Sequence, residues 1–154
     1  MEVKELARVF PELGETGLLR EISKYGHRKS FAIGTEFMGV GREVRFVPLI
    51  LSGSLRVSRE DENGRELYLY GLGEGETCPM SFTCCMVRQR SEICAVVEEK
   101  ADIVLIPVDK MDEWMHKYPG WKSMVMMSYK SRFQELMDTI DSLVFRQLDD
   151  RLMD

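Results

Sequence analysis

Cysteine and histidine are the residue types in this sequence that could bind a metal ion or supply a nucleophile. The chain of 154 residues has four cysteines and two histidines. They are Cys78, Cys84, Cys85, Cys94, His27 and His116. No two cysteines form a C-x-x-C pair, so the spacing typical of zinc ribbons and iron–sulfur sites is missing. Two histidines cannot build a histidine-rich metal centre, and we expect them at the surface or at helix ends.

Two interpretations of the cysteines stay open. Cysteines in a chain without a secretion signal are typically free thiols, because the cytosol keeps them reduced, and one interpretation is that these thiols are buried. Alternatively, Arg88 and Arg90 supply the positive surroundings that a reactive thiolate at Cys84 or Cys85 needs. We favour burial.

Signatures of catalysis are also missing. The sequence has no nucleophile and base at an interpretable spacing, and no G-x-x-x-x-G-K-[ST] loop that would hold a nucleotide phosphate. A cupin-like metal enzyme would share a jelly-roll fold, but it draws several histidines to one site, and here the two histidines flank the whole β-rich region. We therefore expect a protein that is not an enzyme.

Composition is typical of one ordinary globular domain. Hydrophobic residues make up 44% and charged residues 31% of the sequence, which excludes disordered and collagen-like chains. The net charge of −5 is unfavourable for nucleic-acid binding by this chain alone, since phosphate affinity comes from clustered lysine and arginine. No apolar run approaches the about 18 residues of a membrane-spanning helix, and the N-terminus lacks a signal-peptide pattern. We expect a cytoplasmic chain with no membrane partner.

The elements that would position any site begin with two short helices. Leu6, Val9, Phe10 and Leu13 have helical spacing, and Thr16 is a candidate N-cap for the second helix. Over residues 31–107, glycines punctuate short runs of β-branched and aromatic residues, which predicts many short strands. Such strands favour a sandwich, barrel or jelly roll.

A β-hairpin is the clearest local prediction. The runs 55–58 and 66–70 flank a turn at residues 61–64, where Asn63 and Gly64 tolerate positive φ angles. Further strands are predicted at 47–51, 93–97 and 103–106. After Pro107, Asp109 is a candidate cap for a helix that Pro119 and Gly120 end.

One long amphipathic helix is predicted over about residues 121–152, because no glycine or proline interrupts this segment. Its broad apolar face consists of Phe133, Leu136, Met137, Ile140, Leu143, Val144 and Leu148. Either the β-roll covers this whole face, or a second copy of the helix packs along part of it as a dimer seam. We favour the homodimer.

The predicted fold class is α+β: a jelly-roll-like antiparallel β-roll with short flanking helices and a long C-terminal dimerisation helix. We place the β-roll and its flanking helices at residues 1–120, and the dimerisation helix with the start of a hinge at 121–154.

This order of elements resembles the effector domain of the Crp/Fnr family, bacterial transcription regulators with a cyclic-nucleotide-binding fold. Residues 51–57, 61–66 and 72–76 resemble the family's hairpin pattern GxxxV…(D/E)xxGxE…LxxG(D/E) without an insertion. Gly34 and Gly41 match two earlier glycine turns, and residues 95–107 match the closing strands. The resemblance covers nearly the whole chain. The cluster-binding N-terminal cysteines of the Fnr branch are missing, since the first cysteine is Cys78.

The resemblance implies a phosphate-binding cassette in which an Arg-Ser pair holds the cyclic phosphate. Counted without gaps, this pair is Arg90 and Ser91. A guanidinium gives charge-assisted hydrogen bonds to an anion, although Arg90 could equally be a solvated arginine. The effector-binding residues we expect are Arg90, Ser91, Met80, Thr83 and, from the middle of the long helix, Thr139.

The chain departs from the family where a Gly-Glu pair would accept the ribose 2′-hydroxyl, because Pro79 and Met80 stand there. Losing a hydrogen bond to a charged group costs about 1.5–3 kcal/mol, which is tenfold or more in affinity. The sequence therefore assigns no definite cofactor. The effector we expect is a cyclic nucleotide, another small anion or a less polar molecule; the alternative is that the chain binds no effector.

The resemblance further implies a hinge at residues 148–152 and a DNA-binding winged helix-turn-helix that is absent from this chain. The sequence does not decide between a truncated fragment and a natural standalone module. The function we expect is a sensory and dimerisation domain of a transcription regulator, which binds a small effector and touches DNA only through the missing domain. The alternatives are a ligand-free dimerisation module and a cupin-like enzyme.

Overall fold

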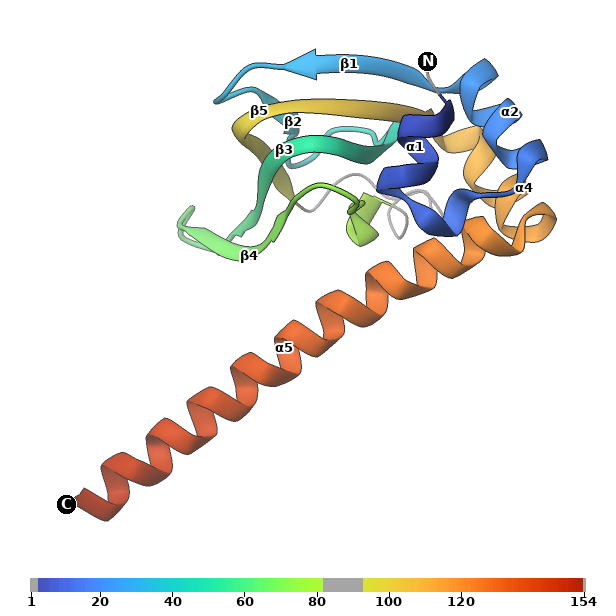
Figure 1. Ribbon diagram of the computed structural model, residues 1–154. Helices are drawn as coiled ribbons and strands as arrows, with labels where there is room; N and C mark the ends of the chain where they lie inside the picture. Colours follow the sequence, from blue (N-terminus) through green and yellow to red (C-terminus); the bar gives the residue numbers. More distant parts are fainter. Residues whose placement is uncertain (1–2, 82–92, 154) are drawn as a thin grey trace.

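The structure is a computed structural model that describes residues 3–81 and 93–153 (Figure 1). Its helices are α1 (Val3–Val9), η1 (Pro11–Leu13), α2 (Thr16–Tyr25), α4 (Val108–Lys117) and α5 (Pro119–Met153). Its strands are β1 (His27–Phe31), β2 (Glu36–Met38), β3 (Phe46–Glu60), β4 (Glu66–Leu72) and β5 (Cys94–Pro107). The predicted fold class, an antiparallel β-roll with flanking helices and a long C-terminal helix, is confirmed.

The five strands form one antiparallel sheet around the two longest strands. The strand order is β1-β5-β3-β4, and β2 also pairs with β5. Alternate side chains of β3 and β5 point into the roll and toward the helices, and residues 47–51 are all buried because both faces are covered there. Figure 1 shows α1, α2 and α4 gathered at one end of the roll.

Segments predicted as separate strands are continuous in the structure. The predicted strands at 47–51 and 55–58 both belong to β3, and those at 93–97 and 103–106 fall largely within β5. Gly53 makes this continuity possible at a bend, because its φ of 87° favours glycine and an added Cβ would clash with the backbone of Lys100. The register shifts between Ile50 and Leu55, so the bend interrupts the register without ending the strand.

The predicted hairpin is confirmed. β3 and β4 pair from Leu55 opposite Leu72 to Glu60 opposite Glu66. Gly64 has a φ of 78°, and one carboxylate oxygen of Asp61 accepts hydrogen bonds from the backbone amides of Asn63 (2.9 Å) and Arg65 (2.8 Å).

The sequence predicted Thr16 as the N-cap of α2, and this prediction is wrong. Thr16 is the first helical residue, and Glu15 occupies the cap position without a side-chain cap bond. The Glu15 carboxylate instead accepts a hydrogen bond (2.7 Å) from the amide of Gly120 in the first turn of α5. A negative charge at that helix end is favourable, so a tertiary contact explains the difference.

Asp109 is not the cap of α4 either. The helix begins one residue earlier, at Val108, and Asp109 lies within its first turn. The Val108 amide donates to the carbonyl of Arg45 at 3.1 Å. A backbone carbonyl from the loop before β3, rather than the Asp109 side chain, therefore accepts a hydrogen bond from an amide at this helix end.

The core has two parts, one under the helices and one inside the roll. The first includes Phe10, Ile22 and the rings of Trp114 and Trp121, which meet edge to face with centroids 5.0 Å apart. The second includes Ile50, Val57 and Ile103 inside the roll. The first turns of α5 belong to the first part, so the long helix is anchored there before it passes β4 and projects beyond the roll (Figure 1).

Candidate functional site

A cleft of about 690 Å³ lies between β4, residues 79–80 and the middle of α5. We call it the β4–α5 cleft. It is lined by Tyr68, Leu69, Tyr70, Pro79, Met80, Tyr129, Arg132, Phe133, Glu135, Leu136, Asp138 and Thr139. Its volume lies within the range of small-molecule sites, about 300–1,000 Å³.

Arg132 joins α5 to the roll at this cleft. Its guanidinium donates to the carbonyl oxygen of Gly71 (2.8 Å) and pairs with the carboxylates of Glu76 (2.5 Å) and Glu135 (3.3 Å). It also stands over the ring of Tyr70, 5.3 Å from the centroid. The side chain of Arg132 is only 15% exposed, so these charge-assisted bonds form in partly desolvated surroundings, where they are stronger.

Further hydrogen bonds attach residues 77–79 to the same helix. Ser128 donates to the carbonyl of Thr77 (3.2 Å), and Tyr129 donates to the carbonyl of Pro79 (3.1 Å). The hydroxyl oxygen of Tyr70 lies 3.5 Å from the Sγ atom of the buried Cys78. The pKa of this hydroxyl is raised far above its usual value, mainly by burial and further by Cys78. The phenol therefore stays protonated and neutral at the cleft wall.

Two of the predicted effector residues lie in the described part of the chain, and both line this cleft. Met80 comes from the segment after Thr77, and Thr139 comes from α5. The Thr139 hydroxyl donates to the carbonyl of Glu135 at 2.9 Å, so toward a ligand it offers a lone pair rather than its proton. Arg90, Ser91 and Thr83 lie outside the described residues, and their roles stay predictions.

The apolar face of α5 is uncovered within one chain. Its residues are 39–61% exposed, so the alternative in which the roll covers the whole face is wrong. We call this face the apolar stripe; it consists of Phe133, Leu136, Met137, Ile140, Leu143, Val144 and Leu148. Phe133 and Leu136 belong both to the stripe and to the lining of the β4–α5 cleft.

The two cysteines in the described part of the chain favour burial over reactivity. Cys78 is buried, and Cys94 is partly buried with a thiol pKa raised by burial and nearby glutamates, which is unfavourable for a reactive thiolate. Cys84 and Cys85 lie outside the described residues. Over residues 3–81 and 93–153, no group of three acidic, cysteine or histidine side chains could hold a metal ion. No described helix is long and apolar enough to cross a membrane.

Sequence reasoning missed Arg132, Tyr70 and Tyr129. On α5, Arg132 and Phe133 follow Tyr129 by three and four residues, and this helical spacing indicates a shared face. Nothing in the sequence pairs Arg132 with Glu76, because this contact joins two elements 56 residues apart.

Replacing Arg132 with methionine should lower the free energy of unfolding by about 1–3 kcal/mol, since the charge-assisted bonds to Glu76 and Gly71 are lost. Urea denaturation measures this change. Arg59→Met is the control, because Arg59 is exposed on β3, and we expect its effect to stay within about 0.5 kcal/mol. Additive effects of Arg132→Met and Glu76→Gln in a double-mutant cycle would contradict the assigned ion pair.

Solved structures share this architecture. A protein described as a Crp/Fnr-family transcriptional regulator from Eubacterium rectale is 24% identical, with 89% of this chain and 63% of that chain covered and a TM-score of 0.74. The Thermus thermophilus catabolite activator protein is 20% identical, with 88% of this chain and 63% of that chain covered and a TM-score of 0.67. The c-di-GMP responsive regulator CLP of Xanthomonas campestris is 16% identical, with 85% of this chain and 65% of that chain covered and a TM-score of 0.71. No family model and no curated protein matches the sequence.

These likenesses establish the fold of the chain. It has the antiparallel β-roll and long C-terminal helix found in Crp/Fnr-family regulators and cyclic-nucleotide-binding proteins. This chain spans a little under two thirds of the length of each of those three chains.

Proposed function

We propose that this chain is the sensory and dimerisation part of a Crp/Fnr-type transcription regulator. A small effector binds in the β4–α5 cleft, two chains pair along the apolar stripe, and a change in their arrangement reaches a DNA-binding domain that follows α5 in the whole protein. The division of labour between residues 1–120 and 121–154 is part of this proposal. The chain itself carries out no reaction in this account.

One observation carries the proposal: Phe133 and Leu136 line the cleft and also begin the apolar stripe. A ligand in the cleft would touch side chains that a second helix also needs. An effector that prefers one arrangement of the paired helices therefore shifts the equilibrium between arrangements.

The lining indicates the class of effector. Tyr68 and Tyr70 provide aromatic surface, and Arg132 provides a cation whose present partner, Glu76, an anionic ligand would have to displace or share. A flat, small anion, such as a cyclic nucleotide, suits this combination. The neighbouring structures include a kinase regulatory subunit with bound cAMP. Met80 gives no carboxylate for a ribose hydroxyl, so we propose that cyclic AMP binds tenfold or more weakly than to a site with that acceptor.

Arg90→Glu tests the assignment of the anion-binding arginine. We expect it to abolish calorimetric binding of any cyclic nucleotide that the unaltered chain binds, because a carboxylate would then face the phosphate, while the dimer stays intact in sedimentation. Arg20→Glu is the control, since Arg20 is exposed on α2, away from the cleft. Unchanged affinity of the Arg90→Glu chain would defeat the assignment.

A second candidate is a dimerisation module without a ligand, which Pro79 and Met80 favour because the ribose acceptor is lost. A thermal-shift screen with cyclic AMP, cyclic GMP and inorganic phosphate separates the two candidates, because a ligand of the native state raises the apparent stability. A rise in Tm supports the sensory role, and no shift with any of them favours the module.

A further inference from the structure

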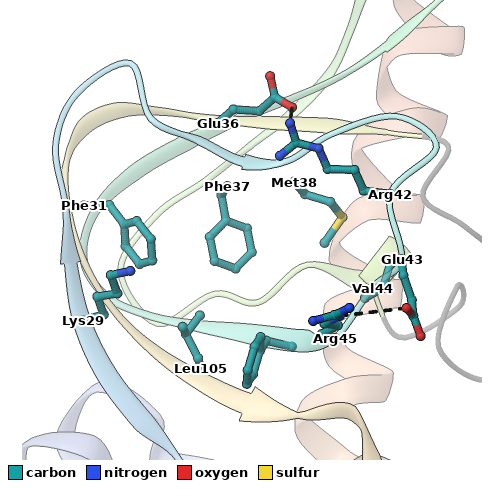
Figure 2. A pocket seen from close by; sticks show the side chains of 11 residues that line it. Lys29, Phe31, Glu36, Phe37, Met38, Arg42, Glu43, Val44, Arg45 and Leu105 are labelled. Atoms are coloured by element: carbon teal, nitrogen blue, oxygen red, sulfur yellow. Dashed lines mark ion pairs between the residues drawn. The ribbon is translucent and has the colours of Figure 1, made fainter.

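We propose that a second hollow at the other side of the roll binds a small amphipathic anion, consisting of one aromatic ring with a carboxylate. This β1–β2 hollow has a volume of about 260 Å³ and lies among β1, β2, the loop before β3 and the adjoining part of β5 (Figure 2). Among the described residues, it shares no lining residue with the β4–α5 cleft. It is therefore a separate site.

Aromatic and aliphatic side chains form the inner wall of the hollow. The rings of Phe31 and Phe37 meet edge to face, with centroids 5.6 Å apart and planes at 82°. Met38 and Leu105 continue the apolar surface, and Figure 2 shows the two rings pointing into the same space. An aromatic ligand could extend this edge-to-face pair, an arrangement that is favourable beyond the area it buries.

The charged side chains around the opening have an excess of one positive charge. Glu36 pairs with Arg42 at 3.7 Å, and Glu43 pairs with Arg45 at 3.8 Å. Lys29 forms no ion pair within the described part of the chain, and its ammonium stands 5.3 Å from the centroid of Phe31. Figure 2 shows that ammonium beside the ring inside the hollow. A single negative charge on the ligand would therefore meet Lys29 without competing for either arginine pair.

Size restricts the ligand further. A volume of about 260 Å³ lies below the range of sites for drug-sized ligands, roughly 300–1,000 Å³. A molecule with one ring fits this space, whereas a nucleotide with base, sugar and phosphate suits the larger cleft. The combination of an apolar wall and one surplus cation thus selects an aromatic monocarboxylate.

Titration of the full chain with benzoate, followed by NMR, tests this proposal. We expect saturable shifts centred on the amides of residues 29–46 and 105, and about fivefold weaker binding for Lys29→Gln, the size of effect expected for a partly exposed ion pair. Benzamide, which has the same shape without the charge, should bind the unaltered chain with a similar loss.

Lys24→Gln is the matched control, because the Lys24 ammonium also stands over an aromatic ring, that of Tyr25 at 5.2 Å, but outside the hollow. We expect this variant to bind benzoate like the unaltered chain. Equal affinity for benzoate and benzamide, equal binding by Lys29→Gln, or shifts centred on the β4–α5 cleft would each overturn the proposal. Arg90→Glu should leave benzoate binding unchanged, so this site can fail or succeed independently of the effector cleft.

Discussion

Replacing Ile140 with aspartate is expected to convert a dimer of this chain into monomers. Ile140 is 50% exposed at the centre of the apolar stripe, so the substitution removes little packing within one chain. In a paired helix it would place two carboxylates, one from each copy, in an apolar seam. We expect the dimer to dissociate at about 100-fold higher protein concentration or more, as measured by sedimentation equilibrium.

Ser142→Asp is the control for this experiment. Ser142 is exposed two residues away, about 200° around the helix from Ile140, and therefore points away from the seam. It adds the same charge to the same helix, and we expect the dimer to persist. If Ile140→Asp and Ser142→Asp had the same effect, the apolar stripe would not be the interface.

Replacing Trp121 with alanine is expected to have the largest effect on stability. Trp121 is fully buried and packs edge to face against Trp114, where α5 is anchored in the part of the core under the helices. Truncating a buried tryptophan leaves a cavity and costs about 3–5 kcal/mol. For a chain of this size we expect Tm to fall by roughly 10 °C, measured by calorimetry at fixed protein concentration because dimerisation also affects Tm.

Met126→Ala provides the comparison on the same helix. Met126 is 50% exposed in the chain, and we expect its truncation to change the free energy of unfolding by no more than about 0.5 kcal/mol. Equal destabilisation by the two substitutions would mean that α5 is not anchored through Trp121.

Patterns that depend on neighbouring residues predicted most of the fold. Asn63 and Gly64 announced the hairpin, because its turn requires positive φ, and the uninterrupted sequence after Pro119 announced the long helix. The helix caps at Thr16 and Asp109 were wrong because groups distant in the sequence satisfy the amides at these helix ends. The separate strands predicted at 47–51 and 55–58 are one strand with a bend at Gly53, where the backbone of Lys100 lies too close for a Cβ.

The candidate site was less predictable than the fold. The stripe of α5 could be identified from its period, and its exposure in one chain agrees with the expected pairing, which stays a prediction. Arg132 could not be assigned from sequence, since its role depends on Glu76 and Gly71 approaching from the roll. The β1–β2 hollow was missed because Phe31, Phe37 and Leu105 meet only after β1 and β5 pair.

Oxidative cross-linking of a Leu143→Cys chain tests the central claim most directly. A disulfide needs Cα atoms about 4.4–6.8 Å apart, which equivalent seam positions of two parallel, in-register helices can provide. We expect a covalent dimer from Leu143→Cys, and none from Ser142→Cys or from the unaltered chain with its native cysteines. If Leu143→Cys cross-linked no more than Ser142→Cys, two chains would not pair along the apolar stripe, and the signalling account would be wrong.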